Sequence, residues 1–221
     1  MTVAHPPLEQ HFVVSWIDWD TYVIFSDKLG ERNIRVNYNG VNMELMTTSL
    51  EHENAKTLLA RLLEALTEEM DIEIKSGGSL TCRRQDLDQG FEPDESYWIE
   101  RAAQMFDRND LDLTRDPPPD LLLEVEISRS FVDRLAIAAR LGVPEVWRYN
   151  GQTIRIMLLG SDGHYVENTR SRAFPFLSVS ELIRFLHSDL SRSETKLLRA
   201  FRAWVREQMV NGWPTAPAAP S

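Results

Sequence analysis

The chain has 221 residues, 43% of them hydrophobic, so it is long enough and apolar enough to bury a core of its own. Its formal net charge of −10 argues against a protein that holds nucleic acid through a broad basic surface. The single cysteine, Cys82, excludes an internal disulfide framework and suits a small core residue. No stretch approaches the roughly 20 consecutive apolar residues of a membrane span, so we expect a cytoplasmic protein with no membrane partner.

Composition divides the chain into one domain with two short ends. Residues 1–15 have neither the basic start nor the apolar core of a signal segment, and they predict an N-terminal tail. Residues 16–210 are patterned throughout and predict a single domain. Residues 211–221 are rich in proline and alanine, which is typical of a disordered C-terminal tail.

The first elements of the domain are a helix and a hairpin. Apolar residues recur at helical spacing before Gly30, a helix-terminating residue, and these are Trp19, Tyr22, Phe25 and Leu29. Two alternating segments then flank Asn39-Gly40, a common type I′ turn pair. A two-residue turn at Asn39-Gly40 would place Arg35 opposite Glu44.

A long helix and three short strands follow. Thr48 and Glu51 form a possible capping box for a helix that runs to about Asp71. Residues 72–99 then predict three strands separated by glycine-bearing turns, and the third strand contains Asp94.

The remaining elements begin with a polar, proline-rich excursion over residues 100–119 and the strand of "LLLEVEI". Ser130 and Asp133 predict the start of a helix that stops at Gly142. A second hairpin is centred on Asn150-Gly151. Two amphipathic helices close the chain, one after Ser178 and one over residues 194–210.

Two carboxylates interrupt the apolar strand "LLLEVEI". Because strand side chains alternate, Glu124 and Glu126 point to the same face as Leu122. A carboxylate in a dry core costs several kcal/mol unless it meets a cation, a donor or a proton. Either this face is solvated, or a metal ion or a basic side chain lies over it.

Four segments resemble a known family when they are taken together. They are "MELM" with the following "EH", "EPD", "PPDLLLEVEIS" and "DRLAIAARLGVPEVWRY". In this combination the chain, from about Trp16 to Gln208, resembles the Uma-two family of restriction endonucleases within the PD-(D/E)XK nuclease superfamily. The resemblance implies an α/β fold (an α+β mixed sheet), with a restriction-endonuclease-like core, flanking helices and an N-terminal helix-hairpin.

The resemblance also implies a metal site. The positions that match the superfamily's ligands are Asp94, Glu124 and the backbone carbonyl of Val125. Hard oxygen ligands of this kind suit Mg²⁺ or Mn²⁺. If the two carboxylates converge without a metal, they repel each other, so neutralising either one would leave the apo protein as stable or more stable.

The chain departs from the family pattern at three positions. Glu126 stands where the superfamily has a lysine; family members carry the lysine on the next helix, where this chain has Arg134, and Ala138 stands where they often have tyrosine. Arginine is a poor general base, but it can hold a phosphate or hydroxide. Arg134 could instead form an ordinary ion pair with Glu126, and Glu126 could bind a second metal or face water.

Glu44 and His52 match two further family positions, and both could face the metal. The alternatives are a cross-strand pair of Glu44 with Arg35 and a helix-start position without chemistry for His52.

Basic and aromatic residues surround the matched positions. Lys75, Arg83 and Arg84 could form a positive strip that meets phosphates, although such residues often form only a solvated face. The aromatic residues of this region favour the core, and they are Tyr97, Trp98, Trp147 and Tyr149.

Two functions are compatible with this pattern. The first is a Mg²⁺-dependent endonuclease that cuts DNA as a homodimer, so that two sites address two strands. The second is a nuclease-fold module that has lost catalysis and acts in binding or assembly.

Overall fold

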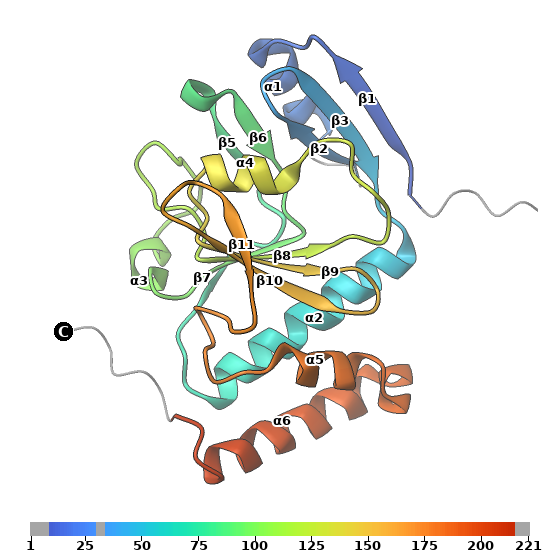
Figure 1. Ribbon diagram of the computed structural model, residues 1–221, viewed down its shortest axis with the longest axis vertical. Coiled ribbons are helices and arrows are strands. Elements are labelled where there is room, and N and C mark those ends of the chain that lie inside the picture. The colour runs from blue at the N-terminus through green and yellow to red at the C-terminus, as the bar shows by residue number, and fades with distance from the viewer. Residues whose placement is uncertain (1–8, 30–33, 215–221) are drawn as a thin grey trace, which may run out of the picture.

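Two β-sheets and six α-helices form the part of the chain that the computed structural model describes, residues 9–29 and 34–214 (Figure 1). The five-stranded sheet has the order β1 (His11–Ser15), β3 (Asn42–Thr47), β2 (Ile34–Tyr38), β6 (Gln89–Phe91) and β5 (Cys82–Arg84). The six-stranded sheet has the order β11 (Tyr165–Asn168), β10 (Ile154–Leu159), β9 (Glu145–Tyr149), β8 (Leu121–Val125), β7 (Glu95–Trp98) and β4 (Lys75–Ser76). The fold is therefore mixed α/β, but with two sheets where one was expected.

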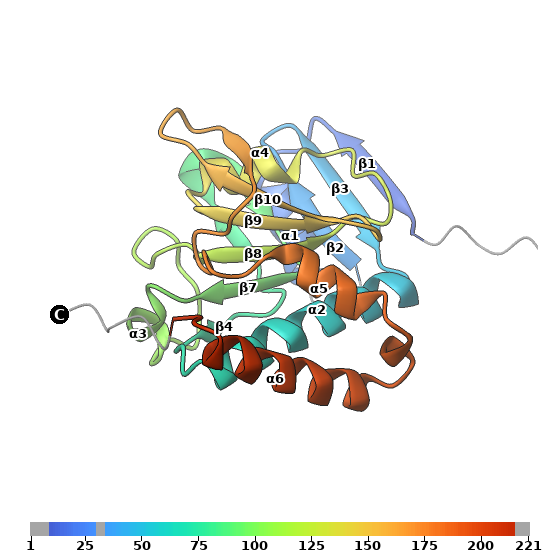
Figure 2. The same ribbon diagram turned by 60° about the horizontal axis from the view of Figure 1, so that its bottom comes forward.

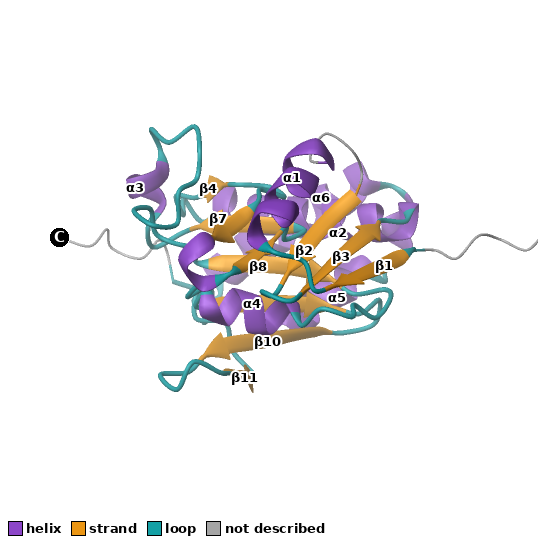
Figure 3. Ribbon diagram, turned by 90° about the horizontal axis from the view of Figure 1, so that it is seen from above, coloured by secondary structure: helices purple, strands orange, loops and turns teal. Residues whose placement is uncertain are grey.

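The helices of the described residues pack on both sheets, and the first of them packs on the five-stranded sheet. They are α1 (Trp19–Leu29), α2 (Leu50–Glu69), α3 (Ala102–Met105), α4 (Arg134–Arg140), α5 (Val179–Leu186) and α6 (Glu194–Val210). Helices α2, α5 and α6 cover one face, and α4 lies on the other face, next to the five-stranded sheet (Figures 1 and 2). Seen from above, β1, β3 and β2 cross over the six-stranded sheet at an angle (Figure 3).

The split into two sheets occurs at Glu92, Pro93 and Asp94. Residues 89–98 belong to two strands, β6 and β7, because the chain leaves one sheet after Phe91 and enters the other at Glu95. Proline has no N–H to donate to a strand ladder, so it suits the point where pairing stops. Asp94 consequently lies at the junction of the two sheets.

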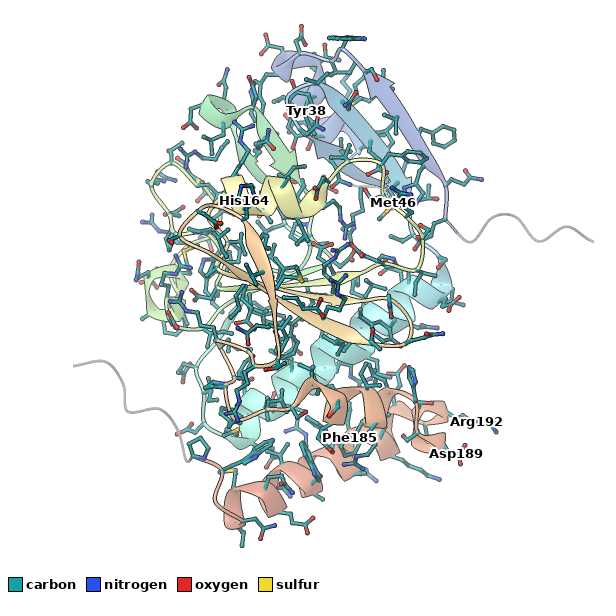
Figure 4. All side chains as sticks on the ribbon, viewed as in Figure 1. Tyr38, Met46, His164, Phe185, Asp189 and Arg192 are labelled. Atoms are coloured by element: carbon teal, nitrogen blue, oxygen red, sulfur yellow. The ribbon has the colours of Figure 1, made fainter. Side chains whose placement is uncertain are left out.

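Strand β8 lies between antiparallel β7 and parallel β9. Leu121, Leu123 and Val125 pack into the core shared with α2, α5 and α6, whereas Leu122 faces α4 and β6. Phe185 of α5 (labelled in Figure 4) lies in the core shared with α2, α5 and α6. The centroid of its ring is 5.0 Å from that of Phe201 on α6.

The predicted N-terminal tail is wrong for residues 11–15. They form β1, which pairs with β3 and places His11 beside Met46 and Ser15 beside Asn42. Only residues 1–8 lie outside the described part at this end, and residues 215–221 at the other. Gly30, the predicted stop of the first helix, also lies outside it.

In both Asn-Gly hairpins the two turn residues lie one position later in the chain than predicted. Tyr38 pairs with Met43 and Tyr149 with Ile154, so each asparagine is the last paired residue before the turn and the glycine is the first turn residue. Glu44 therefore lies opposite Asn37, and the predicted Arg35–Glu44 pair is wrong. The side-chain oxygen of each asparagine accepts two backbone N–H groups of its own turn, which favours this position.

The helix starts follow local hydrogen bonds. Ser49, rather than the predicted Thr48, caps α2, because its hydroxyl accepts the N–H of His52 at 3.0 Å. Asp133 caps α4 as predicted, by accepting the N–H of Ala136 at 3.1 Å. In the described part of the chain, none of the helices is both long and apolar enough to cross a membrane.

Candidate active site

Asp94 and Glu124 come together because β7 and β8 are paired. Asp94 immediately precedes β7, Glu124 lies near the end of β8, and Glu95 of β7 pairs with Leu123 of β8. Both carboxylates are buried, with relative exposures of 0% for Asp94 and 4% for Glu124. Two negative charges that are buried on these paired segments require positive partners.

Arg134 supplies the nearest positive charge. It is the first residue of α4, and its Nη2 atom contacts the Glu124 carboxylate and lies 3.6 Å from Oδ2 of Asp94. One nitrogen atom thus bridges the two carboxylates. The guanidinium is itself buried, and burial lowers the pKa of Arg134 from its ordinary value while the charge of Asp94 opposes that shift.

His52 holds the other side of Asp94. Its Nε2 atom donates to Oδ1 of Asp94 at 2.9 Å, and its Nδ1 atom donates to Oε1 of Glu9 at 2.8 Å. Arg35 approaches the same Asp94 oxygen, with Nε at 3.8 Å. His52 therefore contacts one member of the acidic pair, Asp94.

The backbone of β8 also contacts Asp94. Oδ2 of Asp94 accepts the N–H of Val125 at 2.8 Å. Although burial alone would raise the pKa of Asp94, the hydrogen bonds from His52 and Val125 and the charge of Arg134 together hold it below its usual value. Asp94 is thus ionised at neutral pH.

Glu44 belongs to a second buried group, next to the first. Its carboxylate accepts hydrogen bonds from the Ser130 hydroxyl at 2.5 Å, the Phe131 N–H at 2.8 Å and Nδ1 of His11 at 2.9 Å. Burial would raise the pKa of Glu44, but these hydrogen bonds lower it overall. Glu44 thus anchors the loop between β8 and α4, and none of its hydrogen bonds is to Asp94 or Glu124.

A hydrogen-bonded chain connects the two groups. Nε2 of His11 contacts the Ser128 hydroxyl at 2.6 Å, and that hydroxyl donates to Glu9, the partner of His52. Glu9 and His11 lie in the segment that was predicted to be a tail, so the sequence analysis missed both. The run Phe12-Val13-Val14 carried a usable signal, because aromatic and β-branched residues favour strands.

Glu126 lines the same pocket as Glu124 but has a different arginine as its partner. Its carboxylate binds the guanidinium of Arg148, with Nε at 2.9 Å and Nη2 at 2.6 Å from Oε1. The suggested ion pair of Glu126 with Arg134 is therefore wrong. Glu126, Arg129, Arg134 and Arg148 line a cleft of about 310 Å³ beside the acidic pair.

The predicted basic strip does not form. Lys75 lies on β4 of the six-stranded sheet, while Arg83 and Arg84 lie on β5 of the other. Arg83 pairs with Asp27 and Arg84 with Asp86. The four aromatic residues expected in the core, Tyr97, Trp98, Trp147 and Tyr149, are buried as predicted, as is Cys82.

The donor chemistry of the acidic pair fits a hard divalent cation. Mg²⁺ commonly takes one or two carboxylates and completes its octahedron with water and substrate oxygens, which Asp94 and Glu124 allow. Oε1 of Glu124 lacks a hydrogen-bond donor among the described residues, whereas Oε2 contacts Arg134. Within residues 9–29 and 34–214, no group of three or more aspartate, glutamate, histidine or cysteine side chains is placed to hold a metal ion, so the pair would supply the two protein carboxylates alone.

Fold and site together define a mixed α/β protein with a buried, cation-bridged carboxylate pair on adjoining central strands. The chain belongs to the Uma2 family, whose family model, described as "Putative restriction endonuclease", matches residues 19–191. Among solved structures, the chain is similar to "a putative nuclease belonging to DUF820" from Anabaena variabilis ATCC 29413, with 12% identity and a TM-score of 0.40 over 62% of this chain and 83% of that one. A comparison with curated proteins found no match.

Proposed function

We propose that this protein is an endonuclease that hydrolyses DNA phosphodiester bonds with the help of Mg²⁺ or Mn²⁺. The observation that carries the proposal is the buried pair of Asp94 and Glu124, bridged by a single cationic atom, next to a cleft lined by three arginines. Membership of the Uma2 family supports it. The restriction-endonuclease-like core that the family resemblance implies is part of this proposal.

Asp94 and Glu124 would hold the metal ion, together with the backbone carbonyl of Val125. When bound, such an ion neutralises charge on the scissile phosphate and lowers the pKa of a bound water. His52 would orient Asp94 through its 2.9 Å hydrogen bond, and Arg35 would add positive charge on the same side. Glu44 would act indirectly, by fixing the loop that leads to Arg134.

The arginines of the cleft would bind the DNA backbone. Arg129, Arg134 and Arg148 line this cleft together with Glu126 and Asp133, in a protein of formal net charge −10. Phosphate contacts supply most of the affinity of such an interface and make it dependent on salt. Arg134 is the group best placed to hold the reacting phosphate, since it lies between the carboxylates and the cleft.

A plasmid-nicking assay tests the proposal. Purified protein should nick supercoiled DNA with Mg²⁺ or Mn²⁺ and not with EDTA, and Asp94→Ala and Glu124→Ala should abolish nicking. Arg134→Ala should reduce the rate by about 100-fold or more, as loss of one transition-state contact typically does. Glu167→Gln is the matched control, because this exposed carboxylate pairs only with Arg155 at the surface. Equal nicking by all variants would identify a contaminating nuclease.

The second candidate is a catalytically degenerate module that acts in binding or assembly. The bridging position of Arg134 favours it, because a protein cation already neutralises the acidic pair. Metal binding without cleavage of supercoiled, linear or single-stranded DNA would support this candidate.

A homodimer that presents two sites to two DNA strands belongs to the same proposal. Sedimentation equilibrium of the purified protein, with and without a DNA duplex, measures it directly.

A further inference from the structure

Arg134 lies between Asp94 and Glu124. Its Nη2 atom contacts the Glu124 carboxylate and lies 3.6 Å from Oδ2 of Asp94, so one nitrogen atom serves both carboxylates. Charge attraction to the two carboxylates therefore holds the guanidinium in the position that a bound cation would take.

Arg148 provides the contrast within the same cleft. Its guanidinium makes three hydrogen bonds to Glu126 through Nε and Nη2. A forked arrangement of this kind fixes both the position and the orientation of an arginine. Of the two arginines, Arg134 is therefore the one that stands between the two carboxylates of the acidic pair, while Arg148 binds Glu126.

A place for the displaced side chain already exists. Arg134 lines the cleft of about 310 Å³ as well as the acidic pair, together with Ser130, Asp133 and Arg148. With Arg134 in place, the free space beside Glu124 is only about 10 Å³, room for about one water molecule and too little for a hydrated ion. The guanidinium and a divalent cation would thus compete for one position.

We propose that Arg134 is a built-in counter-ion which a divalent cation must displace from between Asp94 and Glu124, and that the displaced guanidinium turns into the cleft where a phosphate would lie. This inference rests on the proposed metal-dependent function. In the metal-free protein Arg134 neutralises the acidic pair, and in the loaded protein it faces the substrate.

A counter-ion that the metal must displace affects metal affinity and catalysis in opposite directions. The apparent affinity for the ion equals the intrinsic affinity multiplied by the fraction of molecules in which Arg134 has left the carboxylates. Removing Arg134 should therefore strengthen metal binding while it weakens catalysis. An arginine that only stabilised the fold would change neither property in this way.

The test is a titration with MnCl₂ in the absence of DNA, followed by calorimetry and by thermal melting. We expect the half-saturating Mn²⁺ concentration of Arg134→Met to be about 10-fold lower than that of the parent, within the usual range of coupling between competing states. Without metal, Arg134→Met should melt on the order of 10 °C lower, because two buried carboxylates lose their cation. Mn²⁺ should recover most of that loss.

Two further variants keep the test decisive. Arg206→Met removes the same charge from an exposed position on α6, where it pairs with Glu69, and its half-saturating Mn²⁺ concentration should change by less than about 2-fold. Arg134→Lys keeps a positive charge near the two carboxylates, so the variant should fold. Because lysine carries a single flexible point charge, its half-saturating Mn²⁺ concentration should lie between those of the parent and Arg134→Met.

The failures of the two proposals are distinguishable. Mn²⁺ binding that is equal or weaker in Arg134→Met and Arg134→Lys than in the parent overturns the counter-ion role and leaves the metal site standing. An absence of Mn²⁺ binding in every variant overturns the metal-dependent function, and the counter-ion role with it.

Discussion

His52 and Glu9 lie 43 positions apart in the chain and share a hydrogen bond of 2.8 Å, while the second ring nitrogen of His52 binds Asp94. Both partners are carboxylates, so the ring donates from both nitrogens and carries a positive charge. Burial alone would lower the pKa of His52, but the hydrogen bonds and charges of Asp94 and Glu9 raise it to about 9.

The raised pKa of His52 predicts a pH dependence of stability. A group whose pKa is higher in the folded state stabilises fully below its unfolded value, here 6.5, and its contribution is lost as the pH rises through about 9. The free energy of unfolding of the parent should therefore fall across this window, by roughly 3 kcal/mol from this residue. Urea unfolding at a series of pH values measures the slope.

His52→Gln is the control for that slope, because glutamine cannot titrate. The difference in unfolding free energy between parent and variant should shrink as the pH rises from 6.5 to 9. A constant difference would show that another group controls the pH dependence.

The structure reverses one expectation about the acidic pair. Neutralising Asp94 or Glu124 was expected to relieve repulsion and to stabilise the apo protein. Because Arg134 and His52 already neutralise the pair, Asp94→Asn or Glu124→Gln should instead leave a buried cation unpaired and lower stability, by about 3 kcal/mol. Thermal melting in EDTA measures this, and an unchanged or higher melting temperature would contradict it.

Glu44 should matter for the loop between β8 and α4. Glu44→Ala removes the acceptor of the Ser130 hydroxyl, the Phe131 N–H and His11, and buried donors without partners cost about 1–3 kcal/mol each. We expect lower stability and faster hydrogen exchange at the Phe131 amide. Protection of that amide equal to the parent's would show that the loop is held elsewhere.

Gly90 tests the packing beneath the five-stranded sheet. A methyl group at this position would overlap the buried ring of Tyr22, which stacks on Tyr38 at 4.8 Å. Gly90→Ala should therefore destabilise the protein by about 3 kcal/mol. Tyr22→Phe removes the nearest atom, a hydroxyl without a hydrogen-bond partner among the described residues, so the double variant should recover part of the loss.

Local patterns in the sequence predicted most helices and strands, and the family resemblance selected Asp94, Glu124, Arg134 and His52, which the fold brings together. What could not be predicted depends on long-range partners. The residue type of Glu126 does not predict whether it pairs with Arg134 or with Arg148. Its partner depends on the parallel pairing of β8 and β9, which places Arg148 beside Glu124 and within reach of Glu126.

The break of residues 89–98 into two strands illustrates the same limit. Pro93 marks a position that cannot donate to a ladder, but only the three-dimensional fold decides that the two sides join different sheets. The contribution of Glu9 likewise depends on β1 pairing with β3, far along the chain.

Strand β1 depends on its polar contacts for correct alignment. A strand usually keeps its alignment because slipping by one residue would expose its buried face, but Phe12, Val13 and Val14 are all exposed, so burial gives β1 little protection. The side chains of Glu9 and His11, fixed on His52, Ser128 and Glu44, supply that protection instead. Loss of these contacts would free an apolar edge strand to slip, to pair with other chains and to aggregate.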